Sequence, residues 1–448
     1  MESLDRLLET ARGRAARDIA ARLRAAGHTA HLVGGAVRDL LRGVAPADLD
    51  LTTSARPEVV GKIFRGVRFV GETFGVSLVR SGESEIEVAT HRTDGPYSDG
   101  RRPDFVKFAT LEEDLARRDF TVNAMALDLE TGEIRDPFGG RDDLAAKRIR
   151  AVGDPRARMK EDLLRLLRAV RFAHRLGFAI EPELFAAIRD LAPRLSEVAA
   201  ERIRDEATRI LTSPRAGQGL ELLSSSGLLA VFLPEAERMR GVPQPPEFHP
   251  EGDVWVHTVI LLDLLEHPTE TLAWSGLLHD IAKPATLRTP ERDGVDRIRF
   301  DFHCERGAEM SEKILRRLRF SNDAVERVSV IVLEHLKFKD VDKMRPGRLL
   351  RWVTAPHFEE LLLLHEADCR ASHGDLSASR IAREGLAKAR ALAALPPRVV
   401  TGETLKGLGI APGPRYKPIL EAAYEAQLEG AFADAEGGIE WLRRENRV

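Results

Sequence analysis

Cysteine is scarce in this chain, since its 448 residues include only Cys304 and Cys369. Two thiols exclude a fold held together by a disulfide framework, and they favour a reducing compartment, so we expect a cytoplasmic protein. Long apolar runs are also lacking. The best candidates, Leu272–Leu278 and Leu361–Leu364, are far shorter than the roughly 20 residues that cross a bilayer. We therefore expect no membrane partner.

The net charge of the chain is also small. The chain has 68 Lys and Arg against 71 Asp and Glu, a formal charge of -3, which excludes a uniformly basic nucleic-acid coat and an acidic disordered tail. Acidic residues and arginines interrupt the first residues, MESLDRLLETARGRAARD, so no signal peptide is expected there. The length itself favours three or more domains.

The pattern of apolar residues changes along the chain. Up to about residue 147, short strand-like runs alternate with helical stretches and Gly-rich turns, which predicts an α/β domain. Long amphipathic segments follow, and the Pro-rich stretch Gly241–Gly252 marks a boundary. We predict a multidomain α+β protein with a head at 1–147, an all-α neck at 148–240, a His-rich helical domain at 241–370 and a helical tail at 371–448.

The main polar constellation of the head is a Gly-Gly turn followed by two aspartates. Gly34 and Gly35 lie between an apolar strand and a helix, where backbone N–H groups suit phosphate oxygens, and Arg38 on that helix can add a bidentate contact. Asp48 and Asp50 follow on a predicted strand, where residues two apart point to the same side. Both carboxylates could therefore hold a pair of Mg²⁺ ions that stabilise an in-line displacement at a triphosphate.

These residues carry a resemblance to a known family. GGAVRD…DLDLTT resembles the signature of class II tRNA nucleotidyltransferases, the family of CCA-adding enzymes and bacterial poly(A) polymerases. Further segments are similar to the family's other motifs and occur in the same order: Arg117–Ala126, Asp136–Leu144, Glu161–Phe172 and Ser196–Leu211. The resemblance covers roughly residues 28–235.

The resemblance implies a polymerase-β-like head and a transfer of nucleotides from CTP and ATP to the 3′ end of tRNA. Asp48 and Asp50 would bind Mg²⁺, with Glu87 as a third carboxylate. The residues implied to hold the triphosphate and ribose are Gly34, Gly35, Arg38, Arg118 and Asn123. Residues 90–108 resemble the family's flexible loop, which argues against an enzyme that adds only C.

The segment Glu161–Phe172 would select the base. We expect Asp162 and Arg165 to be neighbours on one helix, because they are three residues apart. A carboxylate accepts from the exocyclic amine of C or A, a guanidinium donates to the adjacent ring nitrogen, and U and G present a carbonyl instead. Arg168 and Arg171 continue the same stripe and could reach phosphate. Residues 150–215 carry 14 Lys and Arg against 10 Asp and Glu, so basic charge is concentrated locally.

A second series of polar residues lies in the His-rich region. Imidazole and carboxylate side chains in this number suit a divalent transition metal of unknown identity. The series resembles the ligand set of an HD-superfamily phosphohydrolase and consists of His257, His279, Asp280, His303, His335 and Asp368. Lys283 is expected on the same helix face as His279, within reach of phosphate, and Cys304 is interpreted as a bystander thiol.

Two alternatives to CCA or terminal-A addition remain open. A poly(A) polymerase would need to grip generic RNA, for which a strongly basic extension would serve, but residues 371–448 carry 11 Lys and Arg against 10 Asp and Glu. The other alternative is chiefly an HD phosphohydrolase whose head serves as an RNA-binding module.

Overall fold

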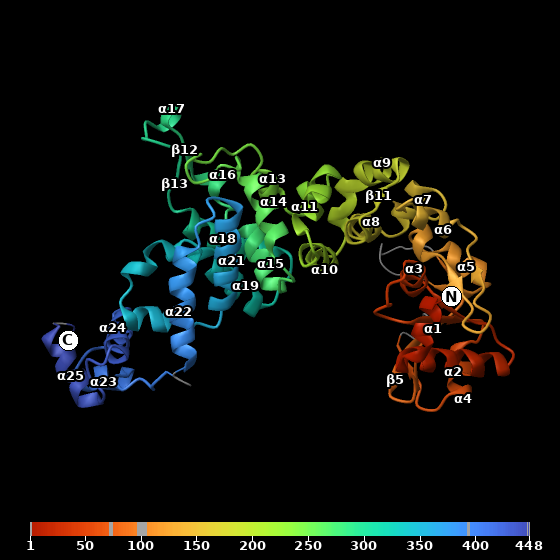
Figure 1. Ribbon diagram of the computed structural model, residues 1–448, viewed down its shortest axis with the longest axis horizontal. Coiled ribbons are helices and arrows are strands. Elements are labelled where there is room, and N and C mark those ends of the chain that lie inside the picture. Colours follow the sequence, from red (N-terminus) through yellow and green to blue (C-terminus); the bar gives the residue numbers. More distant parts are fainter. Residues whose placement is uncertain (1, 71–74, 96–104, 392–394, 446, 448) are drawn as a thin grey trace. The chain divides into compact units, whose positions relative to one another are not determined.

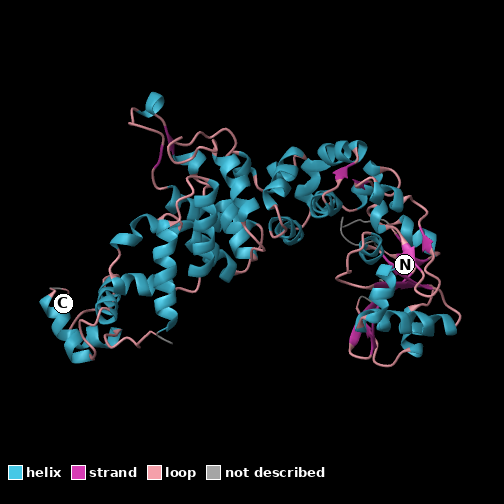
Figure 2. Cartoon of the chain, in the orientation of Figure 1, coloured by secondary structure: helices cyan, strands magenta, loops and turns pink. Residues whose placement is uncertain are grey.

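The computed structural model describes residues 2–70, 75–95, 105–391, 395–445 and 447, and helices predominate in it (Figures 1 and 2). The chain divides into two compact units. The first contains residues up to 210 together with 219–234, and the second contains 211–218 together with 235–448. Across the described ranges, no helix combines the length and apolar character that a membrane crossing requires.

The first unit is built around a mixed seven-stranded sheet. Its strand order is β3-β4-β5-β2-β1-β8-β9, in which β2 and β5 are parallel and the other neighbours antiparallel. The strands are β1 (Ala30–Val33), β2 (Asp50–Thr53), β3 (Arg68–Phe69), β4 (Val76–Ser81), β5 (Ser84–Thr90), β8 (Ala126–Leu127) and β9 (Ile134–Arg135). A separate pair is formed by β6 (Arg92–Asp94) and β7 (Val106–Phe108).

One face of the sheet is packed and the other carries polar groups. On β5, Ile86 and Val88 are buried whereas Glu85 and Glu87 are exposed, the alternation expected of a half-buried strand. Helix α2 (Ala11–Ala25) covers the apolar face with buried residues such as Ile19, in one hydrophobic cluster with the strands. Glu87 therefore lies on the polar face of the sheet.

The remaining helices of the first part of the chain are short, and most begin with a residue that suits a helix start. Thr110 forms a capping box with Glu113, and Asp154 accepts a hydrogen bond from the Ala157 amide. The helices are α1 (Glu2–Glu9), α3 (Gly35–Leu41), α4 (Pro57–Ile63), α5 (Leu111–Ala116), α6 (Gly140–Ala145), α7 (Pro155–Glu161), α8 (Leu164–Leu176), α9 (Pro182–Leu191), α10 (Ala200–Leu211), α11 (Ala216–Ser225), α12 (Leu229–Phe232) and α13 (Pro234–Glu237).

Two sequence predictions for the neck need correction. The expected all-α neck contains a short parallel pair, β10 (Arg148–Ile149) with β11 (Ala179–Ile180). The single helix predicted through Glu161–Phe172 is interrupted, because α7 ends at Glu161 and α8 begins at Leu164. Asp162 has extended backbone angles, and its Oδ1 accepts a hydrogen bond from the Leu164 amide at 3.1 Å. This local bond competes with continuation of the helix.

The second unit is almost entirely helical. It comprises α14 (Val254–Leu264), α15 (Glu270–Leu278), α16 (Lys283–Thr286), α17 (Pro290–Asp293), α18 (His303–Arg317), α19 (Asn322–Glu334), α20 (Pro346–Val353), α21 (Phe358–Ala371), α22 (Ser377–Ala391), α23 (Gly402–Gly407), α24 (Tyr416–Leu428) and α25 (Ala435–Arg444), with a β12 (Leu287–Arg288) and β13 (Arg299–Phe300) pair. Helix α14 packs on α21, and α19 packs on α15 and α18. The predicted multidomain α+β class is confirmed.

Candidate active site and metal centre

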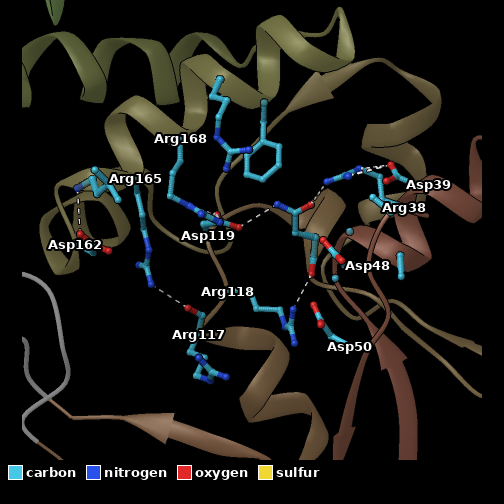
Figure 3. Close-up of a pocket in the computed structure, with 18 of the residues that line it drawn as sticks. Arg38, Asp39, Asp48, Asp50, Arg117, Arg118, Asp119, Asp162, Arg165 and Arg168 are labelled. Atoms are coloured by element: carbon cyan, nitrogen blue, oxygen red, sulfur yellow. Dashed lines mark hydrogen bonds and ion pairs between the residues drawn. The ribbon is translucent and has the colours of Figure 1, made fainter. Parts of the chain in front are cut away.

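A cavity of about 1010 Å³ opens within the first unit (Figure 3). This volume is at the upper end of those typical of small-molecule sites, so a nucleoside triphosphate would fit. The predicted residues among its lining are Gly34, Gly35, Arg38, Asp48, Asp50, Arg118, Asn123, Asp162, Arg165, Arg168 and Arg171. Figure 3 shows Asp48 and Asp50 on one side of it and Arg165 and Arg168 on the other.

The predicted carboxylates come together at one part of the sheet. Asp50 begins β2, and its register partner on the neighbouring parallel strand β5 is Glu87. Asp48 lies before the strand, so the prediction that it lies on the strand is wrong. Its carboxylate pairs with Arg12 at 3.5 Å. Burial raises the pKa of Asp50 and Asp48 adds to the rise, while burial and Asp50 raise the pKa of Glu87. A divalent cation would relieve this repulsion.

A chain of hydrogen bonds joins the two walls of the pocket. Arg38 Nη1 donates to Asn123 Oδ1 at 2.6 Å, Asn123 Nδ2 donates to Asp119 Oδ1 at 3.2 Å, and Arg168 Nε donates to Asp119 Oδ2 at 2.9 Å. Burial would raise the pKa of Asp119, but Arg168 and Asn123 outweigh it and lower this pKa to about 2. Asp119 thus stays ionised and fixes the Asn123 amide and the Arg168 guanidinium.

Sequence reasoning missed Asp119 and a second buried acid, Asp114. Asp114 accepts hydrogen bonds from Arg117 at 2.9 and 3.0 Å and lies 3.5 Å from Arg118 Nη2. Both acids lie in or next to the segment Arg117–Ala126 that carried the family resemblance. A buried anchoring Asp cannot, however, be told from a surface Asp in a charged stretch without the tertiary contacts.

Asp162 and Arg165 were predicted to contact each other, but in the described residues each of them pairs with a different side chain. Asp162 Oδ2 pairs with Arg202 Nη2 at 3.0 Å, and Arg165 Nη1 pairs with Glu161 Oε2 at 2.6 Å. The interruption between α7 and α8 is the reason, because it removes the helical geometry that makes residues three apart neighbours. Arg202 comes from α10, within the segment similar to the family's fifth motif, and was missed.

An aromatic ring lies among three of the pocket arginines. The guanidinium carbons of Arg171, Arg168 and Arg38 lie 4.2, 5.3 and 5.5 Å from the centroid of the Phe172 ring. Arg171 also pairs with the buried Glu206 at 2.6 Å. Cation–π contacts and buried acids therefore hold these like charges close together in the pocket.

The six predicted ligands of the His-rich region gather in the second unit. His257 Nε2 lies 3.0 Å from Asp368 Oδ1, and His279 Nε2 lies 3.1 Å from Asp280 Oδ2. Asp280 Oδ1 lies 3.7 and 3.9 Å from the Nε2 atoms of His303 and His335. These side chains converge from the ends of α15 and α19, the start of α18 and the bodies of α14 and α21.

The imidazoles are oriented as metal ligands require. His279, His303 and His335 each place Nδ1 2.7 to 2.8 Å from a backbone carbonyl three residues earlier, which leaves Nε2 directed at the cluster. Burial lowers the pKa of His335 to about 3 and also lowers that of His303, so both are neutral at pH 7. His279 Nε2 and Asp280 Oδ1 are buried with no hydrogen-bond partner among the residues described. The donor set fits a transition metal.

The Pro-rich stretch Gly241–Gly252 contributes to this cluster, although the sequence marked it only as a boundary. Glu251 Oε1 lies 2.6 Å from His257 Nδ1 and 2.9 Å from His249 Nδ1, and Gln244 Oε1 accepts from Lys283 Nζ at 2.6 Å. Lys283 also pairs with Asp280 Oδ2 at 2.7 Å. It begins α16 instead of sharing a helix with His279, which is a further correction.

Comparison with known proteins agrees with this arrangement. Three family models match: "Poly A polymerase head domain" at residues 30–150, "Probable RNA and SrmB- binding site of polymerase A" at 177–239 and "HD domain" at 254–372. The fold and site therefore define a nucleotidyltransferase with a polymerase-type head, joined to an HD domain. Domains of both types typically use divalent metal ions.

Individual relatives narrow this class. The A-adding tRNA nucleotidyltransferase of Deinococcus radiodurans is 36% identical, over 93% of this chain and 95% of the relative. The CCA-adding enzyme of Geobacillus stearothermophilus is 48% identical over 46% of this chain, and the match spans 51% of that enzyme, or about half its length. The crystal structure of the Bacillus stearothermophilus CCA-adding enzyme in complex with CTP matches with a TM-score of 0.75 and 29% identity, over 98% of each chain. This chain belongs to the tRNA nucleotidyltransferase family.

Proposed function

We propose that this protein is a template-independent tRNA nucleotidyltransferase that adds C and A, or only the terminal A, to tRNA 3′ ends from CTP and ATP. The observation that carries the proposal is the single pocket in which Asp48 and Asp50 face an arginine-rich wall from the segment Glu161–Phe172. The A-adding relative, aligned over nearly the whole chain, and the CTP complex of the CCA-adding enzyme support it.

Asp48, Asp50 and Glu87 are proposed to hold Mg²⁺. The raised pKa values of Asp50 and Glu87 reflect carboxylates that repel one another in a partly desolvated place, and hard oxygen donors suit this ion. When bound, Mg²⁺ would supply charge stabilisation to the transferred phosphoryl group. In the reaction, the tRNA 3′-hydroxyl attacks the α-phosphorus of the nucleotide and pyrophosphate leaves.

The chain's own residues are proposed to bind and orient the triphosphate. Gly34 has a φ of +71°, and a side chain there would come within 3.0 Å of Arg118 Nη1, so glycine keeps this approach open for phosphate oxygens. Arg38, Arg118, Arg168 and Arg171 supply permanent positive charge to the same pocket. Asn123, held between Arg38 and Asp119, would contact the ribose.

Asp162 and Arg165 are proposed to read the base, even though each is bonded to another residue. Asp162 accepts from Arg202 and from the Leu164 amide, and a carboxylate has about four acceptor positions, so it can also accept from the amine of C or A. Arg202 and Glu161 would hold the two reading groups in place between rounds of addition.

The test uses tRNAs that lack three, two or one 3′ nucleotides, with CTP and ATP supplied separately and the product ends sequenced. Extension of all three substrates to CCA supports full addition. Extension of only the tRNA ending in CC restricts the function to terminal A. Long A tracts on any RNA would favour the poly(A) polymerase alternative.

A second activity is proposed for the HD domain, favoured by the convergence of His257, His279, Asp280, His303, His335 and Asp368. It would bind a divalent transition metal and hydrolyse phosphate esters, with Lys283 close enough to contact phosphate. His279→Ala and Asp280→Ala should abolish such hydrolysis and leave nucleotide addition intact. Loss of addition in these variants would instead favour the reading in which the protein is chiefly an HD phosphohydrolase.

The domain limits and location are proposals as well. We propose a head at 1–147, a neck at 148–240, an HD domain at 241–370 and a tail at 371–448. The last strand of the head sheet ends at Arg135, and the tail has its own hydrophobic cluster around Leu405 and Leu442, which support these limits. A cytoplasmic location is proposed from the scarcity of cysteine. Limited proteolysis would test the domain limits.

A further inference from the structure

The HD residues fall into two groups that meet at Asp280. Its Oδ2 faces His279 at 3.1 Å and Lys283 at 2.7 Å, whereas its Oδ1 faces His303 at 3.7 Å and His335 at 3.9 Å. The first group continues to His257. The second group contains a sulfur atom, because ligand atoms of His303, Cys304 and His335 all lie within 4.8 Å of one another.

In the second group, the separation of sulfur and one imidazole is that of two donors around one ion. Cys304 Sγ lies 3.7 Å from His303 Nε2. Ordinary zinc bond lengths to sulfur and nitrogen, combined with a tetrahedral angle, place two such donors about 3.6 Å apart. The separations of 3.7 and 3.9 Å from Asp280 Oδ1 to the imidazoles need only a small contraction toward a common ion.

Local structure fixes these donors before any ion arrives. The chain enters α18 through Phe302, a non-glycine residue with φ of 63°, which is a strained conformation, and His303 and Cys304 are the first two residues of the helix. The Nδ1 atoms of His303 and His335 contact backbone carbonyls, which directs each Nε2 at the cluster. Asp280 is only 1% exposed, and its Oδ1 has no hydrogen-bond partner among the described residues, which independently points to a missing ligand.

We propose that Cys304, His303, His335 and Asp280 form a sulfur-containing metal position beside the one that His257, His279 and Asp368 define. The proposal rests on metal binding by the HD domain and revises the interpretation of Cys304 as a bystander. The thiol would bind as thiolate, and its proton would pass to solvent as the metal–sulfur bond forms. A soft donor selects Zn²⁺ or Co²⁺ over Mg²⁺ or Mn²⁺ at this position.

The experiment is a titration of the full chain, freed of metal with a chelator, with Co²⁺ alone. Thiolate bound to Co²⁺ produces a charge-transfer absorption in the near ultraviolet that oxygen and nitrogen ligands do not. Cys304→Ser is the test variant. Cys369→Ser is its matched control, because Cys369 is the only other cysteine and its Sγ also lies beside an imidazole, 3.6 Å from His365 Nε2.

The parent and Cys369→Ser should show the band, and Cys304→Ser should lose it and bind Zn²⁺ on the order of tenfold more weakly. Equal thermal unfolding of the metal-free proteins would show that the serine variant is folded. The proposal is overturned if the band is absent from the parent, or persists in Cys304→Ser, while His279→Ala still lowers Co²⁺ binding. If His279→Ala has no effect on Co²⁺ binding, metal binding by the HD domain itself fails, and this proposal with it.

Discussion

The pocket of the first unit and the His-rich cluster of the second hold most of their polar side chains through different kinds of partner. In the pocket, permanently charged arginines are held by buried acids: Asp119 binds Arg168, Asp114 binds Arg117, and Glu206 binds Arg171. In the cluster, the imidazoles of His303 and His335 are neutral and their Nδ1 atoms contact backbone carbonyls.

This difference indicates what each site is built to bind. Guanidinium groups cannot lose their charge at physiological pH, so the pocket attracts a polyanion such as a triphosphate whatever the local pH. The neutral imidazoles of His303 and His335 offer lone pairs instead of charge, so these two side chains suit a cation that can accept electron pairs. If the pocket binds a triphosphate with its Mg²⁺ and the cluster binds a transition metal, as proposed, the two sites should respond independently to substitution.

The largest effect that would test this independence comes from Asp48 and Asp50. Replacing both by Ala should lower nucleotide addition on the order of 10³-fold, because the proposed Mg²⁺ loses its ligands and the transferred charge its stabilisation. Metal bound by the HD domain should be unchanged. Steady-state AMP incorporation into tRNA ending in CC and metal analysis of the purified protein provide the two measurements.

Glu85→Ala is the matched control, since Glu85 lies on the same strand as Glu87 but pairs with the exposed Arg68. It should add nucleotides like the parent. If Glu85→Ala lost as much nucleotide addition as the double variant, the acidic side chains would act through their overall negative charge and not as metal ligands.

The next largest effect concerns Asp119, which anchors the arginine wall. Asp119→Ala leaves Arg168 without its buried partner, so the free energy of unfolding at pH 7 should fall by about 3–5 kcal/mol and addition should fall on the order of a hundredfold. Denaturant unfolding would measure the change in the free energy of unfolding. Steady-state kinetics of addition, including the KM for ATP, would measure the change in activity. Asp190→Ala, which breaks the exposed pair with Arg156, should cost less than about 1 kcal/mol.

The pH dependence of the stability of Asp119→Ala tests whether the Asp119 carboxylate stabilises the protein through its charge. The pKa of Asp119 is lowered to about 2, below the ordinary value of 3.8, so its stabilisation is complete above the ordinary value and is lost as the pH falls toward 2. The stability gap between parent and Asp119→Ala should therefore narrow by about 2 kcal/mol between pH 5 and pH 2. A constant gap would mean that the loss comes from packing alone.

Much of the framework on which these sites depend could be predicted from sequence. Short strand-like runs predicted the α/β head, and β5 (Ser84–Thr90) is one of its strands. Asp48 and Asp50 were predicted to lie close together because they are only two residues apart, and both line the pocket. The HD residues, up to 111 positions apart, could be grouped only through the family resemblance. Short-range periodicity carries no information about which distant helices meet.

The errors have a shared physical cause. The segment Glu161–Phe172 has the apolar period of one helix, but the helix is interrupted where the Leu164 amide donates a hydrogen bond to the Asp162 carboxylate. Such bonds compete with regular structure without changing the apolar pattern. Likewise, Pro residues indicated that Gly241–Gly252 is irregular. They could not show that Glu251 reaches His257, because this contact depends on where α14 lies.

A smaller effect is expected from base selection in the pocket. Asp162→Ala removes the acceptor for the amine of C and A, so discrimination against UTP and GTP should fall by about 1–3 kcal/mol, or roughly 5- to 150-fold. Competition between ATP and GTP on tRNA ending in CC would measure it. If discrimination between ATP and GTP were unchanged, Asp162 would not recognise the base, and its role would be to bind Arg202.

The smallest effect lies in the second unit, at Glu251. Its carboxylate contacts His257 Nδ1 at 2.6 Å and so favours the tautomer that presents Nε2 to a metal. Glu251→Gln keeps the shape and an acceptor oxygen but loses the charge, so the affinity of the HD domain for Zn²⁺ should fall about tenfold. Competition with a chromophoric chelator would measure this affinity.

Glu235→Gln serves as the control, because Glu235 in the same unit pairs with Arg317 away from the His-rich cluster, and its Zn²⁺ affinity should equal that of the parent. If Glu251→Gln bound Zn²⁺ like the parent while Asp368→Asn bound it more weakly, His257 would be oriented by Asp368 alone. The contrast between the sites would then be sharper still: acids would hold arginines in the first unit, whereas backbone carbonyls and the ligands themselves would suffice to orient the imidazoles in the second.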